Sequence, residues 1–142
     1  MNSPELYHGT PLSGIKTLTP RQAMNAAYPD RVEEAAVYAS DDIDYSIFMA
    51  IIGKRQWGGW NKKQFGGKGF YIYEEFEEYL NLSQYEEPTG TVYFLGGDSF
   101  EQKAGHEWHS RSPVRVLGSL AVGVQDLPQI AINPARHPYH FR

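Results

Sequence analysis

The sequence predicts one α+β domain, spanning residues 1–142, that contains more strand than helix. A chain of 142 residues has the size of one ordinary domain and is too short for two. Hydrophobic residues make up 41% of it and aromatic residues 14%, which is enough apolar material for a core and argues against disorder. Short apolar runs bounded by glycine and proline indicate strands, and one run with an apolar residue at every fourth position indicates a helix.

Two strands are expected in the first third of the chain. Residues 5–10 form a short, aromatic-rich run closed by glycine and proline, and residues 35–39 form a second short apolar run. Between them, the prolines of segment 11–30 predict a mostly irregular crossing, with a turn of helix around residues 21–27.

The clearest helix follows the second strand directly. Isoleucine recurs at every fourth position from 43 to 51, which gives a helix one apolar face. Ser40 or Asp41 is expected to cap its amino end. There the negative charges of the nearby aspartates interact favourably with the positive end of the helix dipole. Gly53 is the expected stop.

The second half of the chain is predicted to consist mainly of strands. The glycine-rich segment 54–69 is expected to be a loop, and the tail from about residue 129 is expected to be a loose surface segment. Strands are predicted at 70–73, 90–95, 107–110 and 114–122.

Charge and composition exclude several classes of function. Lysine and arginine number 13 against 17 aspartates and glutamates, and the net charge of −4 argues against a protein that mainly coats phosphate backbones. The absence of cysteine excludes disulfides, thiolate metal sites and cysteine nucleophiles. The longest apolar run, 48–52, is far shorter than the ~20 residues of a membrane span. The amino terminus lacks the pattern of a signal peptide, so we expect a cytoplasmic protein without a membrane partner.

Two motifs stand out together. His8-Gly9-Thr10 closes the first predicted strand, and Val37-Tyr38-Ala39-Ser40, about thirty residues later, leads into the helix. Their order and context resemble the ADP-ribosyltransferase superfamily, in the branch marked by a histidine, a tyrosine and a late glutamate. The segments 107–114 and 126–128 look like the carboxyl half of small bacterial proteins with the same His-Gly-Thr start. The resemblance implies split, bent, antiparallel-rich β-sheets with flanking helices and NAD in the cleft between them.

The chemistry of NAD suits the same residues. Gly9 lets its backbone approach the nicotinamide amide closely, because no side chain blocks the way. His8 is expected to bond a ribose hydroxyl. Tyr38 offers a ring that stacks on the nicotinamide face, an interaction worth ~0.5–1.5 kcal/mol beyond burial.

The resemblance also implies further binding residues. Ser46 stands eight residues after Tyr38, where polymerase members carry a serine bonded to the nicotinamide amide. The second aromatic wall expected three residues later is Met49 here, and the adjacent Phe48 is the candidate to replace it. The motif residues Thr10 and Ser40 belong to the same expected NAD site.

The expected reaction breaks the glycosidic bond between nicotinamide and ribose through an oxocarbenium-like transition state. A carboxylate near the ribose 2′-hydroxyl stabilises the developing positive charge and orients the acceptor. Glu107 is the candidate, because alternation along its strand lets it face a cleft, and Glu101 is the reserve. The predicted function is a glycosyltransferase reaction that moves ADP-ribose from NAD to a protein, nucleic-acid or small-molecule acceptor, with His8, Tyr38 and Glu107 as catalytic residues.

Other interpretations of the same residues stay open. His8 can be a satisfied polar residue at a strand end, Tyr38 a core aromatic and Glu107 a solvated carboxylate. His106 and His109 are three apart on a predicted strand and point to opposite faces, so no metal site is expected.

Two alternative functions follow from those interpretations. The first is a non-catalytic nucleotide- or protein-binding module on the same fold. The second is a phage or mobile-element protein whose Trp57 and Trp60 bind another protein.

Overall fold

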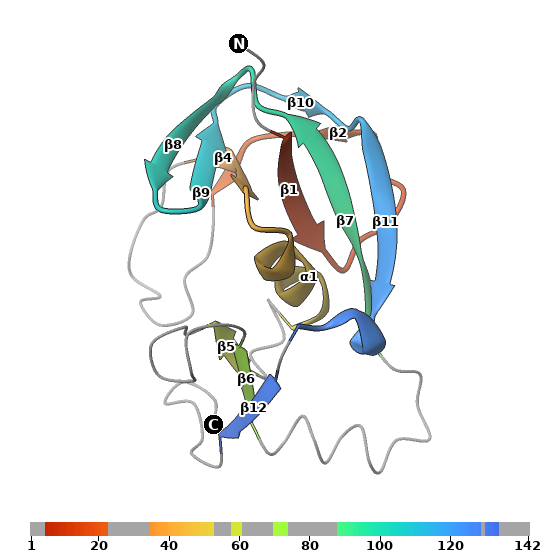
Figure 1. Ribbon diagram of the computed structural model, residues 1–142. Helices are drawn as coiled ribbons and strands as arrows, with labels where there is room; N and C mark the ends of the chain where they lie inside the picture. The colour runs from red at the N-terminus through yellow and green to blue at the C-terminus, as the bar shows by residue number, and fades with distance from the viewer. Residues whose placement is uncertain are drawn as a thin grey trace.

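An antiparallel sheet of seven strands, with one α-helix packed against a face of it, forms the centre of the described structure (Figure 1). The computed structural model describes residues 5–22, 35–52, 58–60, 70–73, 88–128 and 130–133. The strands of this sheet are β1 (Glu5–Thr10), β3 (Arg21–Gln22), β4 (Ala35–Ser40), β7 (Thr89–Gly96), β8 (Phe100–Ala104), β9 (Glu107–Ser110) and β11 (Gly118–Gly123).

The sheet runs in the order β11-β7-β1-β4-β9-β8, and β3 pairs with β4 beside this path. Every recorded pairing in it is antiparallel. The first strand of the chain therefore lies in the middle of the sheet, where a strand can bury both faces. The described residues thus form a mostly-sheet α+β fold, as the sequence predicts at that level.

Two smaller sheets complete the described elements. Strand β2 (Thr17–Leu18) pairs with β10 (Val114–Arg115). Strand β6 (Phe70–Tyr73) lies between β5 (Gly58–Trp60), which is antiparallel to it, and β12 (Ile130–Asn133), which is parallel to it. The sheet formed by β5, β6 and β12 lies below the helix in Figure 1.

Helix α1 (Ile43–Ile51) occupies the predicted position, but its cap differs from the prediction. Asp42 is the N-cap residue, and its Oδ1 accepts a hydrogen bond of 3.0 Å from the Asp44 N–H. The Ser40 hydroxyl accepts instead from the Asp42 N–H at 3.0 Å, which fixes the turn before the helix. The expected stop at Gly53 lies outside the described residues.

The helix backbone rests directly on two strand glycines. A Cβ atom on Gly9 of β1 would lie 1.8 Å from the Ser46 carbonyl oxygen. A Cβ atom on Gly90 of β7 would lie 2.4 Å from the Ala50 carbonyl oxygen. Because real Cβ atoms do not approach a backbone so closely, glycine at both positions is what lets α1 lie against the sheet.

Apolar side chains fill both faces of the sheet. Along β7, Val92 belongs to the cluster under α1 and its neighbour Tyr93 to the cluster on the opposite face, as alternation along a strand requires. The cluster under α1 consists of Phe48, Ala50, Ile51, Ile52, Val92 and Val122. The opposite cluster consists of Leu6, Leu18, Val37, Ala39, Tyr93, Leu95 and Val114.

One predicted strand is divided in the structure because its two parts have different strand partners. The single strand predicted at 114–122 is divided, since β10 pairs with β2 whereas β11 pairs with β7. The Val116 N–H still bonds to the Lys16 carbonyl, and the next N–H, of Leu117, bonds to the Phe94 carbonyl. The chain therefore changes partner between these two residues.

Three further predictions for local structure are wrong where the residues are described. The helical turn predicted at 21–27 begins as strand β3, which pairs with β4. The loop predicted at 54–69 contains strand β5, and the loose tail contains strand β12. In each case the strand is defined by its pairing with another segment, which is β4 for β3 and β6 for both β5 and β12, and the local pattern does not show this pairing. Trp57 lies outside the described residues.

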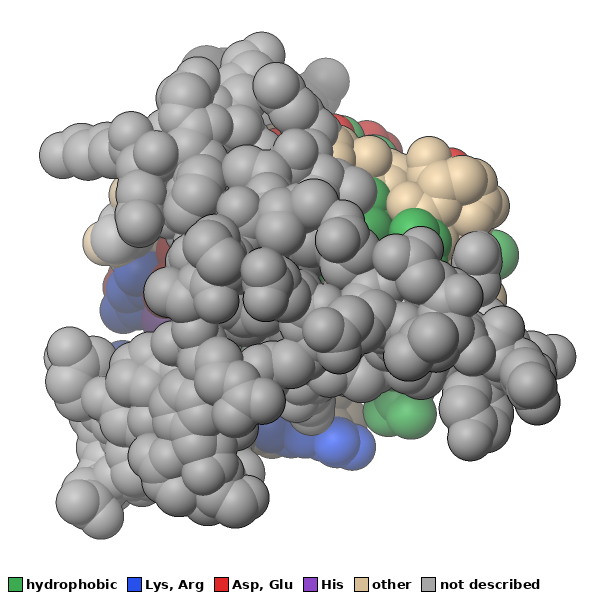
Figure 2. All heavy atoms as spheres, turned by 90° about the horizontal axis from the view of Figure 1, so that it is seen from below, with side chains coloured by type: hydrophobic (Ala, Val, Ile, Leu, Met, Phe, Trp, Pro, Cys, Tyr) green, Lys and Arg blue, Asp and Glu red, His purple; other side chains and the backbone are tan. Residues whose placement is uncertain are grey.

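The described surface shows apolar side chains at separate positions. Among the described residues, the exposed large hydrophobic side chains are those of Leu12, Leu117 and Leu120. In the view from below, the hydrophobic side chains that can be seen form small separate patches (Figure 2). Within the described ranges, neither α1 nor the short 3₁₀ turn Val124–Asp126 is long and apolar enough to cross a membrane.

Candidate functional site

The predicted histidine lies where the central sheet is least continuous. Strand β1 is in register with β7 from Glu5 to Thr10, but its register with β4 consists of Tyr7 opposite Ser40. Just beyond that pair, His8 Nδ1 lies 2.6 Å from the carbonyl oxygen of Tyr38. A carbonyl only accepts, so Nδ1 carries the proton and donates. A side chain thus bridges the two strands where the recorded backbone register ends.

The ring of Tyr38 packs against His109 of the neighbouring strand. The two residues are directly opposite each other in the register of β4 and β9. Their ring centroids are 4.4 Å apart and the planes make an angle of 73°, an edge-to-face arrangement. The side chain of His109 is 11% exposed, so this contact lies largely out of water.

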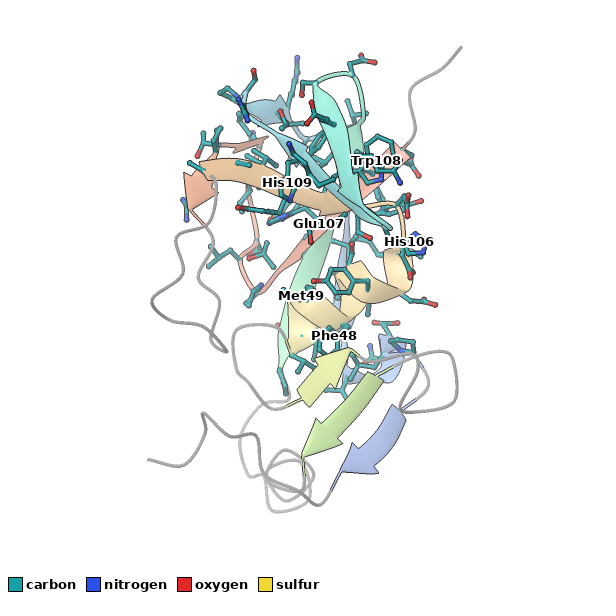
Figure 3. All side chains as sticks on the ribbon, turned by 90° about the vertical axis from the view of Figure 1, so that its left-hand side faces the viewer. Phe48, Met49, His106, Glu107, Trp108 and His109 are labelled. Atoms are coloured by element: carbon teal, nitrogen blue, oxygen red, sulfur yellow. The ribbon has the colours of Figure 1, made fainter. Side chains whose placement is uncertain are left out.

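Glu107 reaches the same imidazole from two residues earlier on β9. Its Oε2 lies 2.6 Å from His109 Nε2. An ionised carboxylate only accepts, so Nε2 donates this hydrogen bond. The Glu107 side chain is 56% exposed, whereas its partner is largely covered. Figure 3 shows both residues on β9, above the helix that carries Phe48 and Met49.

Helix α1 adds a phenol to this group. Burial raises the pKa of Tyr45, and the negative charge of Glu107 raises it further. The charge of Glu107 therefore acts on the phenol of Tyr45 across the space between β9 and α1. The Tyr45 ring also lies 6.3 Å from the ring of Phe48, which belongs to the core under α1.

The three residues predicted as catalytic therefore belong to one neighbourhood. His8 bonds to the Tyr38 backbone, the Tyr38 ring contacts His109, and His109 bonds to Glu107. We call these four residues together with Tyr45 the junction cluster. They come from β1, β4, β9 and α1, which the antiparallel pairings and the packing of α1 bring together.

Four other side chains predicted to bind NAD are buried and have contacts within the fold. Thr10 is 8% exposed, and its hydroxyl accepts from the Leu12 N–H at 3.3 Å. Ser40 is 3% exposed and holds the turn before α1. Ser46 is 2% exposed and its backbone faces Gly9, while Phe48 is 4% exposed in the core under α1. Tyr45, rather than Phe48, is the helix aromatic whose pKa the charge of Glu107 raises.

The reserve carboxylate has a different environment. Glu101 lies opposite His109 in the register of β8 and β9, but its Oε1 is 2.6 Å from the Lys103 ammonium. Its side chain is 73% exposed. Glu107 is therefore the better covered of the two and the one bonded to the imidazole.

The two histidines lie in different elements, because His106 is in the turn before β9 whereas His109 is on the strand. His106 turns away from the junction cluster and bonds to Asp41, with 2.5 Å between Nδ1 and Oδ1. Trp108 Nε1 donates to the other oxygen of that carboxylate at 3.0 Å. We call Asp41, His106 and Trp108 the hairpin clasp, because they tie the β8–β9 turn to the start of α1. In the described part of the chain, no group of three potential ligands could hold a metal ion.

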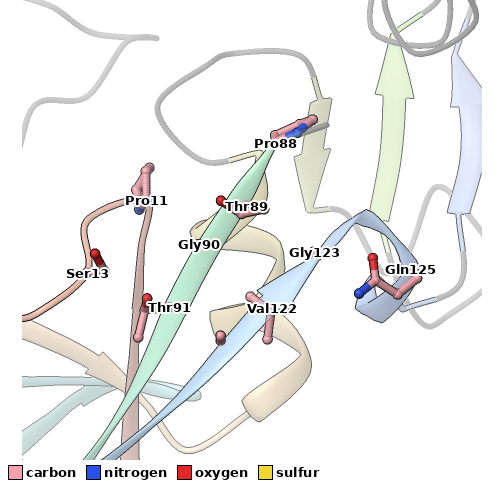
Figure 4. Close-up of a pocket in the computed structure, with 10 residues that line it drawn as sticks. Pro11, Ser13, Pro88, Thr89, Gly90, Thr91, Val122, Gly123 and Gln125 are labelled. Carbon is pink, nitrogen blue, oxygen red and sulfur yellow. The ribbon is translucent and has the colours of Figure 1, made fainter. Parts of the chain in front are cut away.

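A separate surface hollow of about 470 Å³ lies where β7 begins and β11 ends (Figure 4). Its lining includes Pro11, Ser13, Pro88, Thr91, Val122 and Gln125. None of the residues predicted to bind NAD lines this hollow, so it is separate from the predicted NAD site.

Sequence reasoning missed two members of the junction cluster, His109 and Tyr45. The signal for His109 was present, because a residue two positions after Glu107 on a strand points to the same face. Tyr45 lies three residues into a helix whose partner strand is sixty residues away, so its meeting with Glu107 depends on the packing of α1.

Comparison with protein-family models, with curated proteins and with solved structures found no match for this chain.

Proposed function

We propose that the chain is an ADP-ribosyltransferase-like protein that binds NAD, transfers its ADP-ribose to an acceptor and releases nicotinamide. The observation that carries this proposal is the junction cluster. His8, Tyr38 and Glu107 are far apart in sequence, yet a continuous series of contacts through His109 joins them. A histidine, a tyrosine and a glutamate are the residue types that the resemblance requires.

Binding of the nicotinamide half would use the gap between β1 and β4. The N–H and C=O of Gly9 lie in the plane of the sheet, whereas α1 covers the direction that a side chain would take. The helix therefore does not block an amide that approaches along the sheet plane. With Nδ1 of His8 donating to Tyr38, Nε2 is the nitrogen suited to accept from a ribose hydroxyl. The half-buried ring of Tyr38 supplies the aromatic surface.

The proposed chemical step is a displacement at the ribose carbon. The bond between that carbon and the nicotinamide nitrogen breaks, and its electron pair leaves with nicotinamide, which becomes neutral. The acceptor nucleophile bonds to the same carbon and gives its proton to the Glu107 carboxylate, which later passes it to water. Before the transfer, the negative charge of Glu107 stabilises the positive charge that develops on the ribose.

The test is an incubation of the purified chain with NAD, followed by measurement of nicotinamide release and of NAD binding. Glu107→Gln is expected to lower the rate of nicotinamide release about 100-fold or more, while NAD binding is retained. Glu101→Gln is the matched control, because it neutralises a carboxylate on the adjacent strand and leaves the bond to His109 intact.

Two results would contradict the proposal. The first is an absence of NAD binding at millimolar concentration. The second is an equal loss of release in Glu101→Gln and Glu107→Gln, since that would point to general charge rather than to the carboxylate in the junction cluster.

One observation favours the alternative of a non-catalytic nucleotide- or protein-binding module. Four side chains of the expected NAD site, Thr10, Ser40, Ser46 and Phe48, are buried within the fold. A chain that uses them for packing retains the shape of the site with fewer groups to hold the substrate. NAD binding without nicotinamide release, unchanged in Glu107→Gln, would favour this alternative.

A further inference from the structure

We propose that His109 is the positioning residue of this site, which holds both the carboxylate of Glu107 and the ring of Tyr38 in place for the reaction. The inference rests on the proposed function and adds to it a residue that the His-Tyr-Glu pattern does not contain. His109 is the one member of the junction cluster that contacts two of the three predicted catalytic residues through its side chain.

The imidazole is well placed to hold two groups at once. Its side chain is 11% exposed, so it is largely held by its surroundings rather than by water. Nε2 directs its proton at Glu107 over 2.6 Å, while the ring meets Tyr38 at 4.4 Å and 73°. The first contact fixes one oxygen of a carboxylate that is otherwise 56% exposed and free to change rotamer.

The two contacts predict two separable effects. Loss of the hydrogen bond leaves Glu107 in several orientations, and this lowers the rate of the step that needs its charge at one point. Loss of the ring leaves Tyr38 without its edge-to-face partner, which weakens the binding of the aromatic part of the substrate. A residue that only fills space would not separate kcat from KM in this way.

Two substitutions at the same position test each contact alone. His109→Phe keeps a ring beside Tyr38 and removes the donor, so we expect kcat for nicotinamide release to fall about 10- to 100-fold with little change in KM for NAD. His109→Gln keeps an N–H donor near the position of Nε2 and removes the ring. We expect the kcat of His109→Gln to be close to that of the wild type, and its KM for NAD to be several-fold higher.

A double-mutant cycle identifies the partner of the donor. In Glu107→Gln, the further change His109→Phe should lower kcat by less than about 2-fold, because the carboxylate it would position is gone. Additive losses in the double variant would overturn the proposal, and so would an equal kcat in His109→Phe and the wild type.

A readout independent of turnover keeps the test valid if a variant folds poorly. Nitrogen-15 spectra of the wild-type imidazole side chains should show His109 protonated at Nε2, and this resonance should shift in Glu107→Gln but not in Glu101→Gln. A His109 protonated only at Nδ1 would overturn the inference. If the wild type neither binds NAD nor releases nicotinamide, the proposed function itself fails and this inference fails with it. An active wild type with indifferent His109 variants overturns this inference alone.

Discussion

The two halves of the central sheet are built differently. On one side, β1, β7 and β11 are joined by six register pairs at each of their two borders, and α1 rests on their glycines. On the other side, β4, β9 and β8 have shorter registers, and a bulge between Gln102 and Ala104 interrupts the last of them. The two halves meet at one recorded backbone pair, Tyr7 with Ser40, and at the bond from His8.

This difference separates the apolar packing under α1 from most of the polar side chains of the junction cluster. The half under α1 is close-packed and apolar, so it resists changes of volume. The half with β9 carries the polar side chains of the junction cluster, and His8 reaches it from the edge of the first half. A gap between strands is also where a ligand can reach backbone groups that another strand does not use.

The largest expected effect breaks the supporting half. Gly9→Ala would put a methyl group 1.8 Å from the Ser46 carbonyl oxygen, so α1 must move off the sheet. We expect the free energy of unfolding to fall by about 3 kcal/mol. Gly96→Ala is the control, because its Cβ would meet Leu117 Cδ1 at an ordinary 3.6 Å. Urea unfolding measures both variants, and similar losses in the two would show that α1 does not lie against Gly9.

The next largest effect is expected from removal of the hydrogen bond that joins β1 to β4. His8→Ala removes the donor to the Tyr38 carbonyl and should lower the free energy of unfolding by about 1–2 kcal/mol. His8→Asn carries an amide N–H near the position of Nδ1 and should recover at least half of this loss. Thermal and urea unfolding of both variants provide the measurement. Equal losses in the two variants would indicate that the imidazole acts through its volume and not through its hydrogen bond.

The hairpin clasp supports the second half more weakly. Asp41→Ala removes the acceptor of both His106 and Trp108, but these contacts are exposed, so we expect a loss of about 1 kcal/mol or less. Amide exchange in the β8–β9 hairpin should rise, while exchange in β7 stays unchanged. Glu101→Ala, which breaks an exposed pair on the same hairpin, should have a smaller effect. A uniform rise throughout the sheet would contradict a local clasp.

Local sequence patterns were sufficient for the elements that carry them. The isoleucine spacing predicted α1, and the short segments around His8, Tyr38 and Glu107 predicted β1, β4 and β9. Strand β8 was missed, because Phe100–Ala104 is largely polar and exposed and has no strong apolar alternation. Its strand character comes from its pairing with β9.

The candidate site divides in the same way. Which side chains share a strand face follows from alternation, so the pairing of Glu107 with His109 was within reach of the sequence. Whether a small polar side chain binds a ligand or stabilises the fold depends on tertiary contacts, which cannot be read from the local sequence. Thr10 and Ser40 match the motif, yet their hydroxyls bond to the N–H groups of Leu12 and Asp42.

The smallest expected effect is a change of stability at alkaline pH. It tests whether Tyr45 of α1 and Glu107 of β9 interact. Burial first, and then the charge of Glu107, raise the pKa of this phenol in the folded chain above its ordinary 10.0. Below that value the phenol is protonated in both states, and its contribution to stability is fully present. As pH rises further, the unfolded chain loses the proton first, so the free energy of unfolding falls until the folded phenol ionises as well.

Tyr7, whose pKa is raised by burial and by its bond to Glu5, contributes with the same sign and is unaffected by changes at Glu107. Unfolding free energies from about pH 8 to about pH 11 should therefore fall less steeply in Glu107→Gln than in the wild type, and least steeply in Tyr45→Phe. An unchanged slope in Glu107→Gln would mean that its carboxylate does not face the helix. The junction cluster would then lose its contact with α1, while the series from His8 to Glu107 would remain.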